Sequence, residues 1–290
     1  MLRIFASTDR PPNVRRGGPS RFQAVLGLTA LVVSPAFLAP PCAAAADAQP
    51  PVSVFAAASL RESFEAAGRA FAAKTGTDVT FNFGGSDTLE EQIAEGAPAD
   101  VFASANKTQM QKAADGGFIA GEPRVFARNQ LVIVMPKNNP GKITGAADLA
   151  RGGVKLVLAA PTVPVGNYAR TTFANLAKLP EYGAAYEAAV ASNVVSNEVD
   201  VKAVVTKVSL GEADAGVCYL TDVTPSVAKS VSTLAFPAGT APEATYPIAI
   251  VKASKNPAGA QAFIDFILSA DGQAFLKERG FIVAQPAMAR

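Results

Sequence analysis

Four short segments of this sequence place a small or hydroxyl-bearing residue where a predicted strand ends and a predicted helix begins. These segments are Ala56–Leu60, Phe83–Leu89, Pro161–Asn167 and Asn197–Lys202. The first turn of a helix exposes backbone N–H groups without intrahelical acceptors, at the positive end of the helix dipole, and therefore attracts anions. The pattern predicts a set of hydrogen-bond donors for an anion, although ordinary helix capping explains each segment on its own equally well.

The composition excludes several kinds of catalytic and metal site. The chain has no histidine and 2 cysteines, which excludes histidine-ligated zinc and histidine-based acid–base catalysis. Without Cys42, in the expected leader, Cys218 alone can form neither an internal disulfide nor a thiolate cluster. The S-x-x-K patterns at 104–107 and 226–229 and the K-T-G at 74–76 are found in penicillin-recognising hydrolases, but here K-T-G comes first and S-D-N is absent. We therefore predict no enzyme, with a serine hydrolase as a remote alternative.

Residues 1–46 predict a cleaved signal peptide that exports the chain to the periplasm. Early arginines form a basic start, an uncharged stretch runs from Phe22 to Ala46, and cleavage after Ala46 or Ala48 satisfies the small-x-small rule. A membrane anchor is the first alternative, which the prolines of this stretch disfavour, and lipidation at Cys42 is the second. The net charge of +2 depends on those early arginines. The mature chain has no basic face of the kind that binds nucleic acid.

After the leader, short β-branched runs alternate with alanine-rich helical stretches. Strands are predicted at Val52–Phe55, Val79–Phe83, Val101–Ala103, Leu131–Met135, Leu156–Ala159, Asn193–Val195, Ala215–Tyr219, Ser232–Phe236 and Tyr246–Val251. Helices are predicted at Leu60–Lys74, Asp87–Glu95, Lys107–Asp115, Gly166–Lys178, Pro180–Ala191, Asp200–Ser209, Pro257–Leu268 and Asp271–Glu278. This alternation is typical of largely parallel sheets with helices on both faces, which bind ligands at the carboxyl ends of their strands.

Several segments of the chain also carry a resemblance to a known family. They are Val52–Leu60, Gly85–Ile93, Glu95–Ala105, Asn129–Val134, Val163–Ala169, Gly216–Tyr219 and Ala274–Phe281. In this order they resemble the periplasmic molybdate-binding proteins of ABC transporters, and the match covers essentially all of residues 51–283. The resemblance implies an α/β, two-lobe periplasmic binding protein of type II. Each lobe is expected to be a mostly parallel sheet flanked by helices, with the ligand in the cleft.

The same resemblance implies the domain boundaries. Lobe 1 would comprise residues 51–130 plus 246–290, and lobe 2 residues 131–245. The chain would cross between the lobes near Asn129–Leu131 and Tyr246–Pro247.

The resemblance further implies the function and the ligand-binding residues. The protein would be a monomer without a cofactor that captures molybdate or tungstate and delivers it to an ABC transporter permease in the inner membrane. The oxyanion would be held without direct metal ligands, by hydroxyl and backbone groups of lobe 1, backbone N–H groups of lobe 2 and one phenol. These are Ser59 and Ser86, Val165 and Val201, and Tyr219, respectively. The sequence departs from the family at Gly84-Gly85, where relatives often carry more serines, and at Val165, where alanine is common.

A site made only of donors suits a tetrahedral dianion, because such an ion offers only acceptors. Hydrogen phosphate still carries a proton, which would lack an acceptor at a cost of about 1–3 kcal/mol. Sulfate or another oxyanion in the same fold is an alternative. A ferric-ion binder is a remote one, because Tyr219 has no tyrosine neighbour in sequence. No proposed site residue titrates between about pH 6 and 9, so dianion affinity is expected to be level there.

Overall fold

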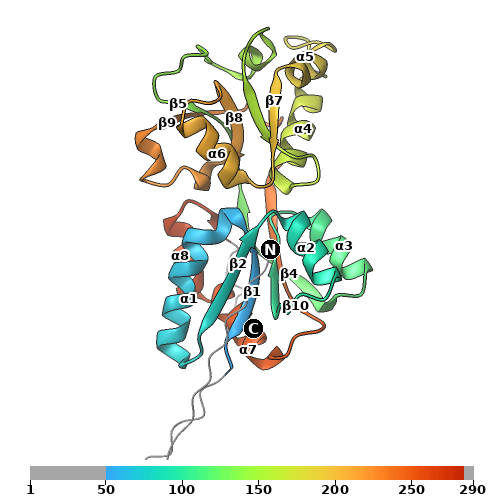
Figure 1. The fold of residues 1–290 in the computed structure, drawn as a ribbon, viewed down its shortest axis with the longest axis vertical. Coiled ribbons are helices and arrows are strands. Elements are labelled where there is room, and N and C mark those ends of the chain that lie inside the picture. Colours follow the sequence, from blue (N-terminus) through green and yellow to red (C-terminus); the bar gives the residue numbers. More distant parts are fainter. Residues whose placement is uncertain (1–49, 284–290) are drawn as a thin grey trace, which may run out of the picture. The chain divides into compact units, whose positions relative to one another are not determined.

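The computed structural model describes residues 50–283. These residues belong to one compact unit, residues 46–290. The predicted signal peptide with Cys42, and the last residues of the predicted lobe 1, lie outside the described part. Two sheets with flanking helices make up that part (Figure 1). Between residues 50 and 283 there is no helix with the length and apolar character needed to cross a bilayer.

The first sheet has 6 strands in the order β11-β4-β10-β3-β1-β2. They are β1 (Val52–Ala57), β2 (Val79–Gly84), β3 (Val101–Ala103), β4 (Ile119–Asn129), β10 (Ala244–Val251) and β11 (Ile282–Val283). The helices that pack on it are α1 (Arg61–Thr75), α2 (Ser86–Ala94), α3 (Lys107–Asp115), α7 (Pro257–Leu268) and α8 (Ala270–Glu278). We call this sheet with its helices, and the 3₁₀ turn η1 (Ala58–Leu60), the first half.

The alternation of side chains along β1 explains why helices cover both faces of this sheet. Val54 and Ala56 belong to the same buried cluster as Phe64 of α1 and Phe263 of α7. Phe55, between them in sequence, belongs to a separate cluster with residues of α2 and α3. Successive residues of a strand point to opposite faces. A run that is apolar throughout is therefore buried on both sides.

The second sheet has 5 strands in the order β7-β6-β8-β5-β9. They are β5 (Leu131–Pro136), β6 (Leu156–Ala159), β7 (Val194–Glu198), β8 (Ala215–Tyr219) and β9 (Val231–Ala235). The helices α4 (Pro164–Leu176), α5 (Tyr186–Ser192) and α6 (Val201–Ser209) accompany it, with the 3₁₀ turns η2 (Ala146–Ala150), η3 (Leu220–Asp222) and η4 (Val227–Lys229). We call these elements the second half.

The expectation of mostly parallel sheets is wrong, because both sheets are mixed. β1 pairs in parallel with β2 and β3, and β6 with β7 and β8. β10 runs antiparallel to β3 and β4, and β5 runs antiparallel to β8 and β9. Parallel neighbours require a crossover connection, usually a helix. β4 and β5 belong to different sheets and are separated in the chain by one residue, Gln130. The chain therefore changes sheet here directly, without a crossover helix.

Two further differences concern single elements. The sequence pattern does not predict β4, since Gly121 and Pro123 interrupt its apolar run, yet β4 pairs along most of its length with β10. The helix predicted from Pro180 begins only at Tyr186. Gly183, with φ 73°, adopts a left-handed conformation that a helix does not contain.

Candidate functional site

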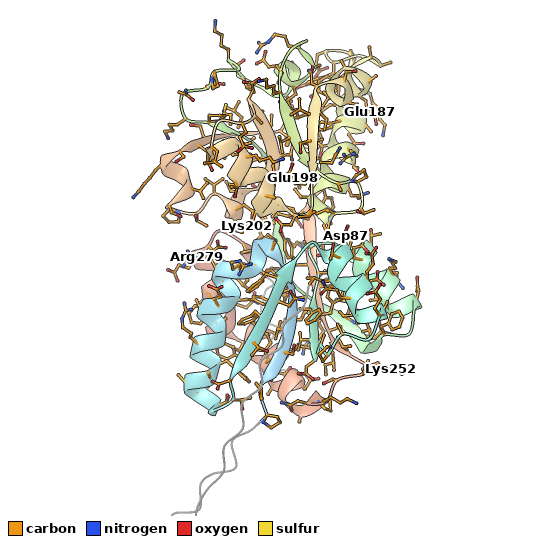
Figure 2. All side chains as sticks on the ribbon, in the orientation of Figure 1. Asp87, Glu187, Glu198, Lys202, Lys252 and Arg279 are labelled. Atoms are coloured by element: carbon orange, nitrogen blue, oxygen red, sulfur yellow. The ribbon has the colours of Figure 1, made fainter. Side chains whose placement is uncertain are left out.

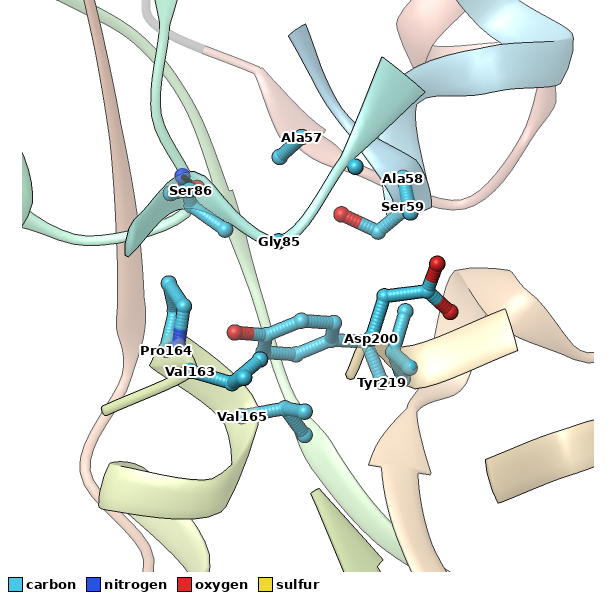
Figure 3. A pocket seen from close by; sticks show the side chains of 13 residues that line it. Ala57, Ala58, Ser59, Gly85, Ser86, Val163, Pro164, Val165, Asp200 and Tyr219 are labelled. Carbon is cyan, nitrogen blue, oxygen red and sulfur yellow. Dashed lines mark hydrogen bonds between the residues drawn. The ribbon is translucent and has the colours of Figure 1, made fainter. Parts of the chain in front are cut away.

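All of the predicted ligand donors line one cavity between the two halves. Ser59 and Ser86 lie on the side of the first half, Val165 lies opposite them, and the ring of Tyr219 lies between (Figure 3). Val201 also lines the cavity. The cavity has a volume of only about 10 Å³, far below the roughly 300 Å³ at which pockets for drug-sized ligands begin. Its size therefore suits a small ion better than an organic solute.

Ser59 is held by another side chain rather than used as a helix cap. It lies in η1, between β1 and α1, and α1 is capped by Leu60 without a side-chain hydrogen bond. Its Oγ atom lies 3.0 Å from the hydroxyl oxygen of Tyr246. The ordinary capping explanation is therefore wrong for this serine.

Ser86 is the first residue of α2 and also does not act as a cap, because Gly85 occupies the cap position. The side chain is buried, and its Oγ accepts a hydrogen bond from the backbone N–H of Ala105 at 3.0 Å. A hydroxyl has one proton and two lone pairs. Because a backbone donor already occupies one lone pair, the proton of Ser86 is available to an acceptor in the cavity.

The second half contributes two helix starts. Val165 follows Pro164, the first residue of α4, so the Val165 N–H is the first backbone donor of that helix. Val201 is the first residue of α6, which Asp200 caps by accepting from the N–H of Ala203 at 2.9 Å. For Asp200 the capping explanation is correct. Val165 and Val201 can therefore offer unpaired N–H groups to the cavity, whatever their side chains.

Gly166 allows α4 to start close to the end of β6. A Cβ atom at this position would lie 2.1 Å from the carbonyl oxygen of Ala160 and 2.4 Å from that of Ala159. No side chain can be accommodated at such distances without moving the backbone. The position of the Val165 N–H therefore depends on a glycine at the next position.

Tyr219 is the last residue of β8 and has 1% exposed surface. Its hydroxyl is buried and finds no hydrogen-bond partner among residues 50–283. Burial and the nearby hydroxyl of Tyr246 raise its pKa well above the ordinary value. The phenol therefore keeps its proton at neutral pH and is a donor without an acceptor, which an oxyanion would supply. Burial likewise raises the pKa of Cys218, so this residue stays a neutral thiol.

Sequence reasoning missed a buried carboxyl next to this phenol. Asp222, with no exposed surface, accepts a hydrogen bond from the N–H of Tyr219 at 3.0 Å. Burial raises its pKa to about 6, and Lys202, whose Nζ lies 3.6 Å from Oδ1, opposes that rise. The only signal in the sequence is an acidic residue shortly after a predicted strand. The expectation that no proposed site residue titrates between about pH 6 and 9 does not cover Asp222, which lies outside the proposed donor set.

The two halves also contact each other beside the cavity. On one side, Nζ of Lys202 in α6 lies 3.0 and 2.9 Å from the carboxylate oxygens of Glu62 in α1. On the other, the hydroxyl of Thr162 donates to Oδ2 of Asp87 at 2.6 Å, and Gln109 donates to the carbonyl oxygen of Thr162 at 3.0 Å. Figure 2 shows Lys202 and Asp87 near the boundary between the halves.

The charge around the cavity restricts what it can hold. No lysine or arginine lines it, and the only charged lining residue, Asp200, is engaged in capping α6. In the part of the chain that the structure describes, no three His, Cys, Asp or Glu residues are grouped so that they could hold a metal ion. Neutral donors and helix starts are what the cavity offers to an anion.

Comparisons with known proteins agree with this architecture. The sequence profile of a family described as "Bacterial extracellular solute-binding protein" matches residues 52–282. The molybdate-binding protein ModA of Mycobacterium tuberculosis is 39% identical over 231 residues, which cover 79% of this chain and 84% of that protein.

Solved structures show the same fold. The periplasmic molybdate-binding protein of Azotobacter vinelandii matches with a TM-score of 0.69 and 24% identity, over 81% of this chain and 100% of that one. The sulfate-binding protein SubI of Mycobacterium tuberculosis matches with a TM-score of 0.72 and 18% identity, over 82% of this chain and 88% of that one. The predicted two-sheet binding-protein fold is thus confirmed.

Proposed function

Because this chain belongs to the bacterial extracellular solute-binding protein family, we propose that its cavity captures molybdate for delivery to an ABC transporter. It is a solute-binding protein rather than an enzyme. The choice of ligand follows the molybdate-binding relative, which is similar over most of both chains. The observation that carries the proposal is the orphaned Tyr219 hydroxyl, which shares one small cavity with two serine hydroxyls and two helix starts.

The proposed ligand donors are those that the sequence predicts: Ser59, Ser86, Val165, Val201 and Tyr219. Each has a proton to give, and the two backbone N–H groups can only donate. Molybdate at neutral pH is a tetrahedral dianion with acceptors only, so every contact can be a donor–acceptor pair. Hydrogen bonds to a charged acceptor contribute about 1.5–3 kcal/mol each. Tungstate has the same shape and charge and is an equal ligand in this proposal.

We assign the two lobes of the proposed clamp as residues 51–130 with 246–290 and residues 131–245. The strand composition of the sheets supports this division, since β1 to β4, β10 and β11 pair together and β5 to β9 pair together. β10 begins at Ala244, two residues before the boundary that we assign. The residues between β4 and β5, and the start of β10, would act as the hinge.

The finer biological setting belongs to the same proposal. A signal peptide of residues 1–46 would deliver the chain to the periplasm, where it would act as a monomer. Its partner would be the permease of an ABC transporter in the inner membrane. Membership of an extracellular solute-binding family supports export.

Unfolding in the presence of oxyanions tests the ligand assignment. A ligand that binds only the folded chain, at about 100 times its dissociation constant, adds about 2.7 kcal/mol to the free energy of unfolding. We expect molybdate and tungstate to raise the melting temperature measured by circular dichroism, because the chain has no tryptophan for fluorescence. The absence of any shift with molybdate, tungstate and sulfate would contradict the proposal.

A further inference from the structure

A series of buried side chains connects Ser59 to the place where the chain passes between the two sheets. Ser59 Oγ lies 3.0 Å from the Tyr246 hydroxyl, and the amide nitrogen of Asn129 lies 3.4 Å from that same hydroxyl. Asn129 ends β4, and Tyr246 lies near the start of β10. All three residues are at most 3% exposed. Their hydrogen bonds are therefore shielded from solvent.

The orientation of the Asn129 amide follows from its backbone neighbour. The N–H of Gln130 donates to Oδ1 of Asn129 at 2.9 Å. A backbone N–H can only donate, so the amide oxygen must face Gln130, and the amide nitrogen faces the other way. That nitrogen lies 2.8 Å from the hydroxyl of Thr221 in η3 and 3.4 Å from that of Tyr246. An amide nitrogen cannot accept, so both contacts are donations from Asn129.

This orientation fixes the protons of the next two groups. The Tyr246 hydroxyl accepts from Asn129, and its single proton is left for Ser59 Oγ, which lies at 3.0 Å. Ser59 then accepts from Tyr246 and keeps its own proton for the cavity that it lines. Hydrogen bonds arranged in one direction polarise one another and strengthen the last donor.

We propose that Asn129 and Tyr246 form a donor relay that holds the Ser59 hydroxyl with its proton directed at the bound oxyanion. The inference rests on the proposed function, since it needs an acceptor in the cavity. Both residues act through Ser59 and are positioning residues. Ser86 reaches the same state by a different route, because a backbone N–H occupies its lone pair. A side-chain substitution can therefore remove the groups that orient Ser59, but not the backbone N–H that orients Ser86.

Tyr219 offers the competing destination for the Tyr246 proton. The two rings pack with their centroids 5.8 Å apart, and the Tyr219 hydroxyl is buried without a partner in the described residues. Ser59 satisfies hydrogen-bond geometry with Tyr246, and in the described residues the Tyr219 hydroxyl does not. If Tyr246 donates to Ser59, removing the Ser59 hydroxyl should cancel the effect of removing the Tyr246 hydroxyl. If Tyr246 donates to Tyr219, removing the Tyr219 hydroxyl should cancel it.

A double-mutant cycle on the full mature chain, measured by calorimetric titration with sodium molybdate, tests the relay. Ser59→Ala should weaken binding about 10- to 150-fold, through loss of a donor to a charged acceptor. Tyr246→Phe keeps the ring packing against Phe126 and Phe281 and should weaken binding about 2- to 12-fold. In the Ser59→Ala background, Tyr246→Phe should change affinity by less than about twofold, because the relay then has no end group.

Tyr186→Phe is the matched control. Tyr186 is also buried, and its hydroxyl donates to the carbonyl oxygen of Ala146 at 2.6 Å, away from the cavity. This variant should lose stability as Tyr246→Phe does, but keep wild-type affinity. The comparison separates a loss of positioning from a general loss of stability.

The possible outcomes separate the relay from the proposed function. Equal losses of affinity from Tyr246→Phe in the wild-type and Ser59→Ala backgrounds would overturn the relay alone. The relay would also be overturned if the effect of Tyr246→Phe disappeared in a Tyr219→Phe background instead. A wild-type chain that binds no molybdate would overturn the proposed function, and the relay with it.

A second substitution applies if Tyr246→Phe does not fold. Asn129→Asp replaces the donating nitrogen by an acceptor and reverses the relay, so that Ser59 must donate to Tyr246. The loss of affinity should be larger in the wild-type background than in the Ser59→Ala background, where only the added charge acts. Equal losses in the two backgrounds would overturn the relay.

Discussion

The two halves supply the proposed oxyanion site with different kinds of donor. The first half contributes the side-chain hydroxyls of Ser59 and Ser86. Ser86 accepts from a backbone N–H and keeps its proton, and in the proposed relay Ser59 does the same by accepting from Tyr246. The second half contributes the backbone starts of α4 and α6, together with the phenol of Tyr219. Side-chain donors can be removed by substitution, whereas backbone donors depend on the local fold. The halves should therefore respond differently to the same substitutions.

The largest expected effect comes from the charge buried in the second half. Asp222 has a folded-state pKa of about 6, raised by burial from its ordinary value of 3.8. The folded chain therefore binds a proton that the unfolded chain has lost, so this contribution to stability is full below about pH 4 and disappears as the pH rises through about 6. Its size is on the order of 3 kcal/mol. Urea unfolding of Asp222→Asn and wild type from pH 4.5 to 7.5 should show the variant gaining relative stability as pH rises.

A constant difference in unfolding free energy between these two proteins across that pH range would contradict the assignment of the buried charge. Lys202 is the natural control, because its ammonium group opposes the rise in the pKa of Asp222. Lys202→Met should move the pH-dependent step to higher pH.

Removing a side-chain donor should weaken binding more than shortening the side chain of a residue that donates through its backbone N–H. Ser86→Ala should cost about 1.5–3 kcal/mol of molybdate binding, since a donor to a charged acceptor is lost. Val201→Ala keeps its N–H and should stay within about twofold of wild type, although it loses packing. Ser104→Ala is the matched serine control, because Ser104 is buried but bonds to Asn106 outside the cavity. Equal losses for Ser86→Ala and Ser104→Ala, measured by calorimetry, would refute the assignment of Ser86 as a ligand donor. Equal losses for Ser86→Ala and Val201→Ala would refute the difference between the halves.

Gly85 lies against the second half, with no room for a side chain. A Cβ atom there would lie 2.7 Å from the carbonyl oxygen of Val199 in the second half and 2.6 Å from Oδ1 of Asp87. Gly85→Ala should weaken binding by about 1–3 kcal/mol, by opposing closure, with little change in unligated stability. Gly84→Ala, whose Cβ would meet Leu89 at 3.6 Å, is an ordinary contact and should cost much less. If the two alanine variants bound equally well in titrations, closure would not depend on this contact.

The smallest expected effect concerns the ion pair between the halves. Glu62 and Lys202 are partly exposed, so the pair should contribute no more than about 1 kcal/mol. Glu62→Gln should therefore weaken molybdate binding by about two- to fivefold, and less at high salt. Asp271→Asn breaks the pair with Lys74 inside the first half and should leave affinity unchanged. Wild-type affinity of Glu62→Gln at low salt would show that the ion pair has no role in closure.

Most helices and strands could be predicted from local pattern, because their apolar periodicity and helix-start residues are local features. β4 could not, since Gly121 and Pro123 mask a strand that is stabilised by long-range pairing with β10. Whether a sheet is mixed also depends on where the chain passes from one sheet to the other. The apolar periodicity of a short segment carries no information about that. Element boundaries were placed within about three residues for most helices, as is usual for local patterns.

The candidate site shows the same division between local and long-range information. Ser59, Ser86 and Val201 stand next to local helix starts and have a signal in the sequence. Tyr246 bonds to Ser59 across 187 positions, and Asn129 bonds to Thr221 across 92. Nothing near either residue in sequence indicates such a contact. The groups that orient a donor could be identified only from the three-dimensional structure.

The central claim is that the donors of this cavity select fully deprotonated tetrahedral dianions. Its most direct test is calorimetric titration of the mature chain with molybdate, tungstate, sulfate and phosphate. At pH 7.5, molybdate and tungstate should bind with similar affinity, and hydrogen phosphate should bind weakest because its protonated oxygen takes a position where an oxygen of a full dianion would accept from a donor. Raising the pH from 7 to 9 should leave molybdate affinity level and improve phosphate binding. Phosphate binding as tight as molybdate binding, or a failure of all four oxyanions to bind, would contradict the account.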